Sequence, residues 1–86
     1  MSKLEQKLKE LGYEKEKNYR IYVKNYLETD IEIWHILTLR NDEISISKIY
    51  CGKCDFTKQE HIDSLQQAFN EMQKDLEVLR EYENNL

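Results

Sequence analysis

The sequence predicts a small α+β domain with the element order α-β-β-β-α, in which a three-stranded antiparallel meander carries both helices on one face. Three observations predict this fold: a leucine stripe near the N-terminus, three β-type segments, and a long apolar seam at helical spacing near the C-terminus. Eighty-six residues are enough for one domain and too few for two, so we expect a single domain over residues 1–86.

The first element is predicted to be a helix over residues 2–11. Ser2 and Glu5 fit a capping box, in which the serine oxygen and the glutamate satisfy free backbone N–H groups. Gly12 follows where a helix often ends in a left-handed residue. Three leucines at helical spacing form one apolar stripe: Leu4, Leu8 and Leu11.

Strands are predicted over residues 19–27, 31–40 and 43–51, which are rich in β-branched and aromatic side chains. Placing Thr29 at the centre of the first connection and a two-residue turn at 41–42 sets the two registers. The predicted core face then holds Tyr19, Ile21, Val23, Leu27, Ile31, Ile33, Leu37, Leu39, Ile44 and Ile46. His35 is also expected on this face, as a hydrogen-bonded structural histidine rather than a catalytic base.

The last element is predicted to be a helix over residues 58–83, begun by a second capping box of Thr57 and Glu60. Its apolar seam has 3-4 spacing and consists of Ile62, Leu65, Phe69, Met72, Leu76 and Leu79. We expect the first part of this seam to pack on the strands, and the end of the helix to expose a stripe of Val78, Leu79, Tyr82 and Leu86.

The charge balance argues against nucleic acid as a direct partner. The chain carries 17 acidic and 13 basic residues, a formal net charge of −4, whereas nucleic-acid binders usually show a basic excess. No apolar run approaches the roughly 20 residues needed to cross a bilayer, and the N-terminus lacks the apolar region of a signal peptide. We therefore expect a cytoplasmic protein with two free thiols.

The stretch CGKC, residues 51–54, is open to three interpretations. Cys51 and Cys54 could form half of a zinc site with His61, but structural zinc needs four ligands and no fourth is evident. They could form a redox pair, but the preceding strand belongs to a meander and the chain has no proline. We favour a turn between strand and helix, with no cofactor, and regard zinc as the alternative. Because no other catalytic constellation is evident, we do not expect an enzyme.

The face of the sheet opposite the core is predicted to bring Tyr22, Trp34, Ile36 and Ile49 together. Exposed aromatic residues are candidate anchors for a protein partner, because Tyr and Trp dominate binding hot spots. The alternatives are that this patch closes a homodimer or that residues 13–18 cover it. For the end of the last helix, the alternatives are a homodimer contact or a monomer in which residues 2–11 fold across it.

The segment HIDSLQQAFNEMQKDLEVL, residues 61–79, resembles small uncharacterised proteins of phages and prophages of low-GC Gram-positive bacteria. The residues that carry this resemblance are Ile62, Asp63, Leu65, Ala68, Phe69, Asn70, Asp75 and Leu76. The predicted element order and the acidic surface also look like certain type II anti-CRISPR inhibitors, a likeness of topology and charge. Together the resemblances imply a module that binds, and inhibits, a host defence or nucleic-acid-handling protein, with a homodimeric accessory protein or a zinc- or thiol-dependent protein as alternatives.

Overall fold

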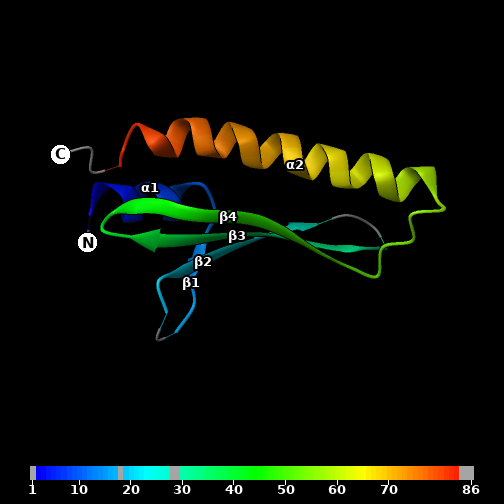
Figure 1. The fold of residues 1–86 in the computed structure, drawn as a ribbon, viewed down its shortest axis with the longest axis horizontal. Coiled ribbons are helices and arrows are strands. Elements are labelled where there is room, and N and C mark those ends of the chain that lie inside the picture. The colour runs from blue at the N-terminus through cyan, green and yellow to red at the C-terminus, as the bar shows by residue number, and fades with distance from the viewer. Residues whose placement is uncertain (1, 18, 28–29, 84–86) are drawn as a thin grey trace.

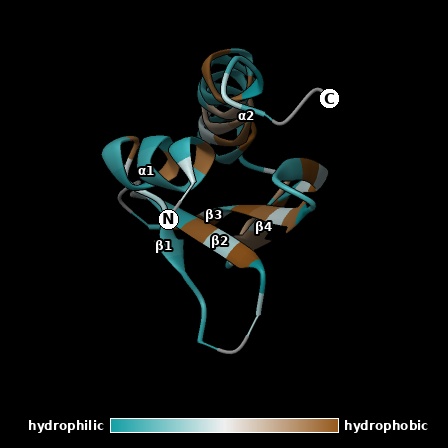
Figure 2. Ribbon diagram, turned by 90° about the vertical axis from the view of Figure 1, so that its left-hand side faces the viewer, coloured by the Kyte–Doolittle hydropathy of each residue, from teal (hydrophilic) through white to brown (hydrophobic). Residues whose placement is uncertain are grey.

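A computed structural model describes residues 2–17, 19–27 and 30–83 of the chain. The elements follow in the order α1 (Lys3–Glu10), β1 (Glu14–Lys15), β2 (Ile21–Leu27), β3 (Glu32–Arg40), β4 (Glu43–Gly52) and α2 (Gln59–Arg80). The strands form one antiparallel sheet in the order β1-β2-β3-β4, and both helices lie on the same face of it (Figures 1 and 2). The predicted α+β class is confirmed, and β1 adds a short fourth strand to the predicted meander.

Helix α1 begins and ends as its local sequence predicts. The Ser2 Oγ accepts a hydrogen bond from the backbone N–H of Glu5 at 3.1 Å, which is one half of a capping box. Gly12 follows the helix with a φ of +94°, a conformation that side chains rarely tolerate. Leu4 and Leu8 of the predicted stripe are fully buried against the sheet and α2.

The start of α2 differs from the prediction, because the second capping box is not formed. The Thr57 hydroxyl donates to the Asp55 Oδ1 at 2.6 Å, and the same oxygen accepts from the Thr57 backbone N–H. This local Asx turn uses the side chain that would have capped the helix. The N-cap is therefore Lys58, which makes no side-chain hydrogen bond to the helix, and α2 begins at Gln59.

The register between β2 and β3 is one residue away from the predicted one. Val23 lies opposite Ile36 rather than opposite residue 35, because four residues rather than three separate the paired Leu27 and Glu32. This one-residue shift in register exchanges the two faces of β2. Ile21 and Val23 consequently face away from the helices, while Tyr22 faces them, and Tyr19 lies outside the strand with an exposed side chain. The predicted turn centre, Thr29, lies outside the described residues.

A β-bulge changes the faces of β4 as well. The predicted register holds at Arg40 opposite Glu43 and at Leu39 opposite Ile44, but Thr38 then pairs with Ile46. The extra residue is Ser45, whose hydroxyl donates to the Thr38 carbonyl oxygen at 3.1 Å. Beyond the bulge the two faces of β4 are exchanged. Ile46, predicted on the core face, points away from the helices, and Ile49, predicted on the opposite face, lies on the side of the helices.

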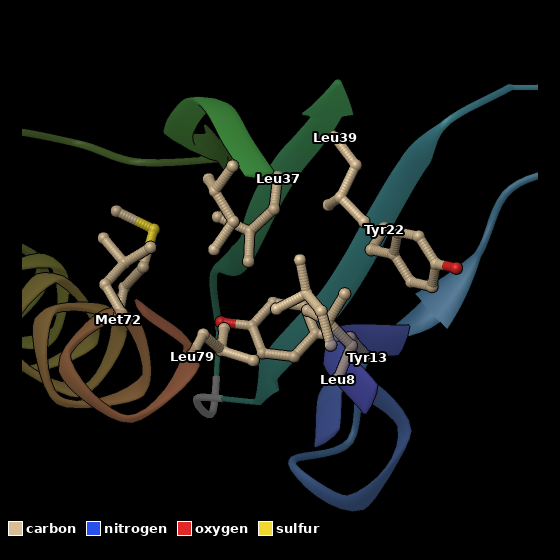
Figure 3. Close-up of a cluster of buried hydrophobic side chains, with 10 residues drawn as sticks. Leu8, Tyr13, Tyr22, Leu37, Leu39, Met72 and Leu79 are labelled. Carbon is tan, nitrogen blue, oxygen red and sulfur yellow. The ribbon is translucent and has the colours of Figure 1, made fainter. Parts of the chain in front are cut away.

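The core occupies the space between the sheet and the helices and has two parts. The larger part contains side chains from both helices, the sheet and the α1–β1 connection (Figure 3): Leu4, Leu8, Tyr13, Tyr22, Leu37, Leu39, Ile44, Met72, Leu76 and Leu79. The smaller part lies under the first half of α2 and contains Ile31, Ile33 and Ala68. We call these the closed end and the open end of the molecule.

The C-terminal end of α2 is covered by α1, as in the second alternative considered above. Leu79 is fully buried with Leu4 and Leu8, and the Lys7 ammonium lies 5.6 Å from the centre of the Tyr82 ring. The prediction that Leu79 belongs to an exposed stripe is therefore wrong. Leu86 lies outside the described residues.

Candidate protein-binding surfaces

The open face of the sheet, which points away from both helices, carries three cross-strand rows of side chains. Reading from β2 through β3 to β4, the registers give the rows Ile21–Thr38–Ile46, Val23–Ile36–Lys48 and Asn25–Trp34–Tyr50. We call the six apolar members the open-face patch: Ile21, Val23, Trp34, Ile36, Ile46 and Tyr50. No helix of the described chain lies over this face (Figure 2).

Trp34 and Tyr50 form the aromatic end row of the open-face patch. They are direct cross-strand partners, and side chains so placed have Cβ atoms about 4.5–5.5 Å apart. Tyr50 is 55% exposed and Trp34 is half-buried. The structure thus keeps Trp34 and Ile36 of the predicted binding set together and adds Tyr50 and Ile46, which the bulge moves onto this face.

Tyr22, by contrast, is a core residue and is withdrawn from the predicted binding set. Its side chain is only 2% exposed and lies in the closed end beside Leu8 and Leu39 (Figure 3). The phenol hydroxyl donates to the Glu5 Oε2 at 2.6 Å, so the polar tip is satisfied at the edge of the core. Burial and the neighbouring Glu5 carboxylate raise the pKa of Tyr22 well above its usual value, and the same hydrogen bond lowers the pKa of Glu5.

Ile49 is likewise not part of the open face. The bulge places it opposite His35 on the side of the helices, where it packs against both parts of the core. There it lines an apolar groove of about 540 Å³, which we call the β4–α2 groove. The other lining residues are Cys51, Phe56, Ile62, Leu65, Gln66 and Phe69. Three of these side chains, Phe56, Ile62 and Phe69, are exposed although the pattern predicted Ile62 and Phe69 to pack on the strands.

A polar cluster lies under α2 and joins the helix to β2 and to the α1–β1 connection. The buried carboxylate of Asp75 accepts hydrogen bonds from the Tyr13 hydroxyl at 3.0 Å and from the Lys24 ammonium at 2.9 Å. Burial, and then the Asp75 charge, raises the pKa of Tyr13 well above its usual value. The lysine and the carboxylate compensate each other's charge, so this cluster is best explained as a structural ion pair.

His35 lies beside this cluster and is fully buried. Its Nδ1 is 3.4 Å from the Tyr13 hydroxyl, its ring stacks on Tyr26, and its Nε2 has no hydrogen-bond partner among the described residues. Burial, with a smaller contribution from the Lys24 ammonium, lowers the pKa of His35 below its usual value. The predicted position on the core face is confirmed, but its hydrogen bonding is incomplete.

The cysteines are joined to each other, which corrects the expectation of two free thiols. Cys51 and Cys54 form a disulfide, and their Cα atoms are 6.1 Å apart, within the 4.4–6.8 Å range of protein disulfides. The turn that connects them holds Lys53 at a φ of +62°. No helix begins next to either sulfur, since α2 starts five residues after Cys54, so the geometry differs from that of a thioredoxin-like redox site.

His61, the third residue of the alternative zinc site, uses both ring nitrogens elsewhere. Its Nδ1 accepts from the Asp55 backbone N–H at 2.9 Å, and its Nε2 lies 2.8 Å from the Asp30 Oδ2. This bond lowers the pKa of Asp30. Within residues 2–17, 19–27 and 30–83, no three His, Cys, Asp or Glu side chains gather in a way that could hold a metal ion. His61 instead fixes the connection between β4 and α2.

None of the helices in the described part of the chain combines the length and apolar character that crossing a bilayer requires. No protein-family model matches the sequence, and no curated protein and no solved structure matches it significantly.

Proposed function

We propose that this protein is a small non-enzymatic binding module that docks on a partner protein through the open-face patch. The observation that carries the proposal is the Trp34–Tyr50 pair, which lies in one end row of an apolar patch on a sheet face that no helix of the described chain covers. Trp and Tyr supply large contact areas at low cost in conformational entropy, and they are enriched at the energetic centres of protein interfaces.

The surroundings of the aromatic pair support a protein partner rather than a small molecule. The two other rows add Ile21, Val23, Ile36 and Ile46, so the patch crosses all three long strands and forms a broad surface rather than a cavity. Lys48 is the charged residue within the three rows, and it lies beside Ile36. An apolar centre with charge near its margin is the usual anatomy of a transient protein interface.

The net charge and the resemblance to phage proteins favour a bacterial host protein with a basic surface as the partner. A module with a formal net charge of −4 is repelled by nucleic acid, yet it is suited to proteins with basic surfaces, including those that handle nucleic acid. We propose a bacterial host protein of this class as the partner, and inhibition as the outcome, because occupying a basic surface competes with nucleic acid for it.

Affinity capture from a bacterial lysate, with matched variants, tests the proposal. Wild-type protein and Tyr19→Glu are expected to capture the same partner, because Tyr19 is 65% exposed but lies outside the patch. Tyr50→Glu and Trp34→Glu are expected to capture at least tenfold less of it, since each replaces an aromatic anchor of the patch by a charge.

Capture has to be paired with a check of folding. Tyr50→Glu changes an exposed side chain, so its thermal unfolding should match that of the wild type. A partner captured equally by wild type and Tyr50→Glu would overturn the proposal, as would the absence of any protein that Tyr19→Glu retains and Tyr50→Glu loses.

A further inference from the structure

Strand β4 is a long unpaired edge of the sheet. In the described chain it pairs with β3 on one side only, whereas the opposite edge is the two-residue strand β1. An exposed edge presents a row of unpaired backbone N–H and C=O groups and acts as a template for another strand. Natural monomers usually block such an edge with charges, proline or a bulge.

Only the beginning of β4 is blocked in this way. The bulge lies at Ser45, and the Ile44 backbone N–H donates to the Glu83 Oε2 at 2.7 Å, so the turn that follows α2 covers this part of the edge. From residue 46 to residue 51 the strand has no proline, and Lys48 is its single charged residue. The second half of β4 therefore remains available for pairing.

Apolar side chains concentrate along the same edge. Eight large hydrophobic residues are exposed in the described chain, and five of them belong to β4, the following connection or the groove side of α2: Ile46, Tyr50, Phe56, Ile62 and Phe69. From their exposed fractions these five side chains present on the order of 500 Å². A stable dimer buries about 800 Å² per partner, of which roughly 60% is apolar. The edge thus offers about the apolar area that one dimer interface requires.

The β4–α2 groove is also chemically suited to a copy of itself. None of its seven lining residues is ionised, so placing two grooves face to face buries no charge. Its polar member, Gln66, donates one N–H to the Asn70 Oδ1 at 3.1 Å, and its second N–H and its carbonyl oxygen are a donor and an acceptor that suit Gln66 of a second copy. An interface on a two-fold axis requires this kind of self-complementary surface.

We propose that the protein forms a two-fold homodimer in which the second halves of two β4 strands pair antiparallel and the two β4–α2 grooves close on each other. A two-fold axis at Ile49 places Lys48 of each copy opposite Tyr50 of the other. An axis at Lys48 would instead place two ammonium groups side by side, which is unfavourable. The dimer contains one continuous eight-stranded sheet, and the two open-face patches lie on the same side of it. The dimer shares Ile46 and Tyr50 with the open-face patch along the β4 edge, whereas the β4–α2 groove lies on the other side of the sheet.

Light scattering tests the dimer directly. The chain mass is 10.5 kDa, so the wild type is expected at about 21 kDa, falling toward 10.5 kDa only on dilution. Phe69→Glu places a charge in the centre of the groove and is expected at 10.5 kDa throughout. Val78→Glu is the matched control on the same helix, since Val78 is exposed but lies outside the groove, and it is expected to remain a dimer.

A second measurement distinguishes loss of the dimer contact from misfolding of Phe69→Glu. Amide hydrogen exchange of residues 46–51 is expected to slow as the wild-type concentration rises, and to be independent of concentration in Phe69→Glu. A wild-type mass of 10.5 kDa from micromolar to millimolar concentration overturns the proposal. So does a dimer that survives Phe69→Glu and is lost in Trp34→Glu, because it would use the open face. Phe69 lies outside the open-face patch and Trp34 lies outside the β4–α2 groove, so loss of the dimer in Phe69→Glu and loss of partner capture in Trp34→Glu test the two proposals separately.

Discussion

The closed end and the open end of the molecule are covered by the same helix but differ in what lies beside it. At the closed end, α1 fills the space next to α2, and ten buried residues form one cluster. At the open end, α2 is alone over the sheet, and the buried cluster contains three residues. The apolar groove and the disulfide both lie at this second end.

The difference follows from the length of α1. Eight helical residues span about 12 Å, whereas the ten residues of β4 span about 33 Å. A helix this short can cover only about a third of the length of the sheet. The stability of the fold is therefore concentrated where both helices pack on the sheet, while the surface left for association lies where α2 packs on it alone.

The largest expected effect is the cost of removing core volume at the closed end. Leu8→Ala should lower the free energy of unfolding by about 2–5 kcal/mol, because Leu8 is fully buried in the ten-residue cluster and its truncation leaves a cavity there. Ile62→Ala at the open end should change it by less than about 0.5 kcal/mol, since Ile62 is exposed in the monomer. Urea unfolding at a concentration where the protein is monomeric measures both, and equal losses would contradict the division into two ends.

A smaller effect is expected from acid, at the boundary between the two ends. His35 lies opposite Ile49, which packs against both clusters, and its folded pKa lies below the value of about 6.5 that the unfolded residue has. The unfolded chain therefore takes up a proton first as the pH falls through 6.5, and the stability falls with it until the folded pKa is reached. The loss is at most about 1.4 kcal/mol per pH unit, the slope for one proton.

Urea unfolding between pH 7.5 and pH 5.5 measures this loss, and His35→Phe should reduce it. Tyr13, Lys24 and Asp75 face the histidine, and Lys24 and Asp75 are already paired with each other. The carboxylates with lowered pKa values, Glu5, Asp30 and Asp55, lose their stabilising effect only at lower pH, outside this window. An unchanged pH dependence in His35→Phe would show that another group is responsible.

The smallest effect is expected from opening the disulfide at the open end. The loop closed by Cys51 and Cys54 is only four residues long, so the disulfide removes little entropy from the unfolded chain. The double substitution Cys51→Ser with Cys54→Ser should lower the free energy of unfolding by about 1–2 kcal/mol. His61 still holds Asp55 in this variant, so the connection to α2 stays in place. A loss as large as that of Leu8→Ala would mean that the open end belongs to the main core.

The element order could be predicted from the sequence because each element carries a strong local signal. Ser2 and Gly12 bound the first helix, and Asn41 and Asp42 adopt the left-handed conformation of a two-residue hairpin turn. Such signals depend on neighbouring residues only, so they do not require knowledge of the tertiary structure.

The faces of the strands were harder to predict because they depend on single residues in connections and bulges. β2 has large apolar or aromatic residues on both faces, so its alternation fits either register. Tyr22 and Lys24 face the helices because Glu5 and Asp75 are there to receive their polar tips, and the sequence pattern does not show these distant partners. Half of the predicted binding set, Trp34 and Ile36, lies on the open face, since β3 alternates clearly; Tyr22 and Ile49 do not.

The contact of α1 with the end of α2 has a consequence for the order of folding. The β2–β3 and β3–β4 hairpins join residues close in sequence and can form early, whereas Leu4 and Leu8 find Leu79 only across almost the entire chain. During synthesis from the N-terminus, α1 therefore emerges first but cannot complete its packing until the last turns of α2 have left the ribosome. The element that is made earliest is the one whose burial finishes the fold.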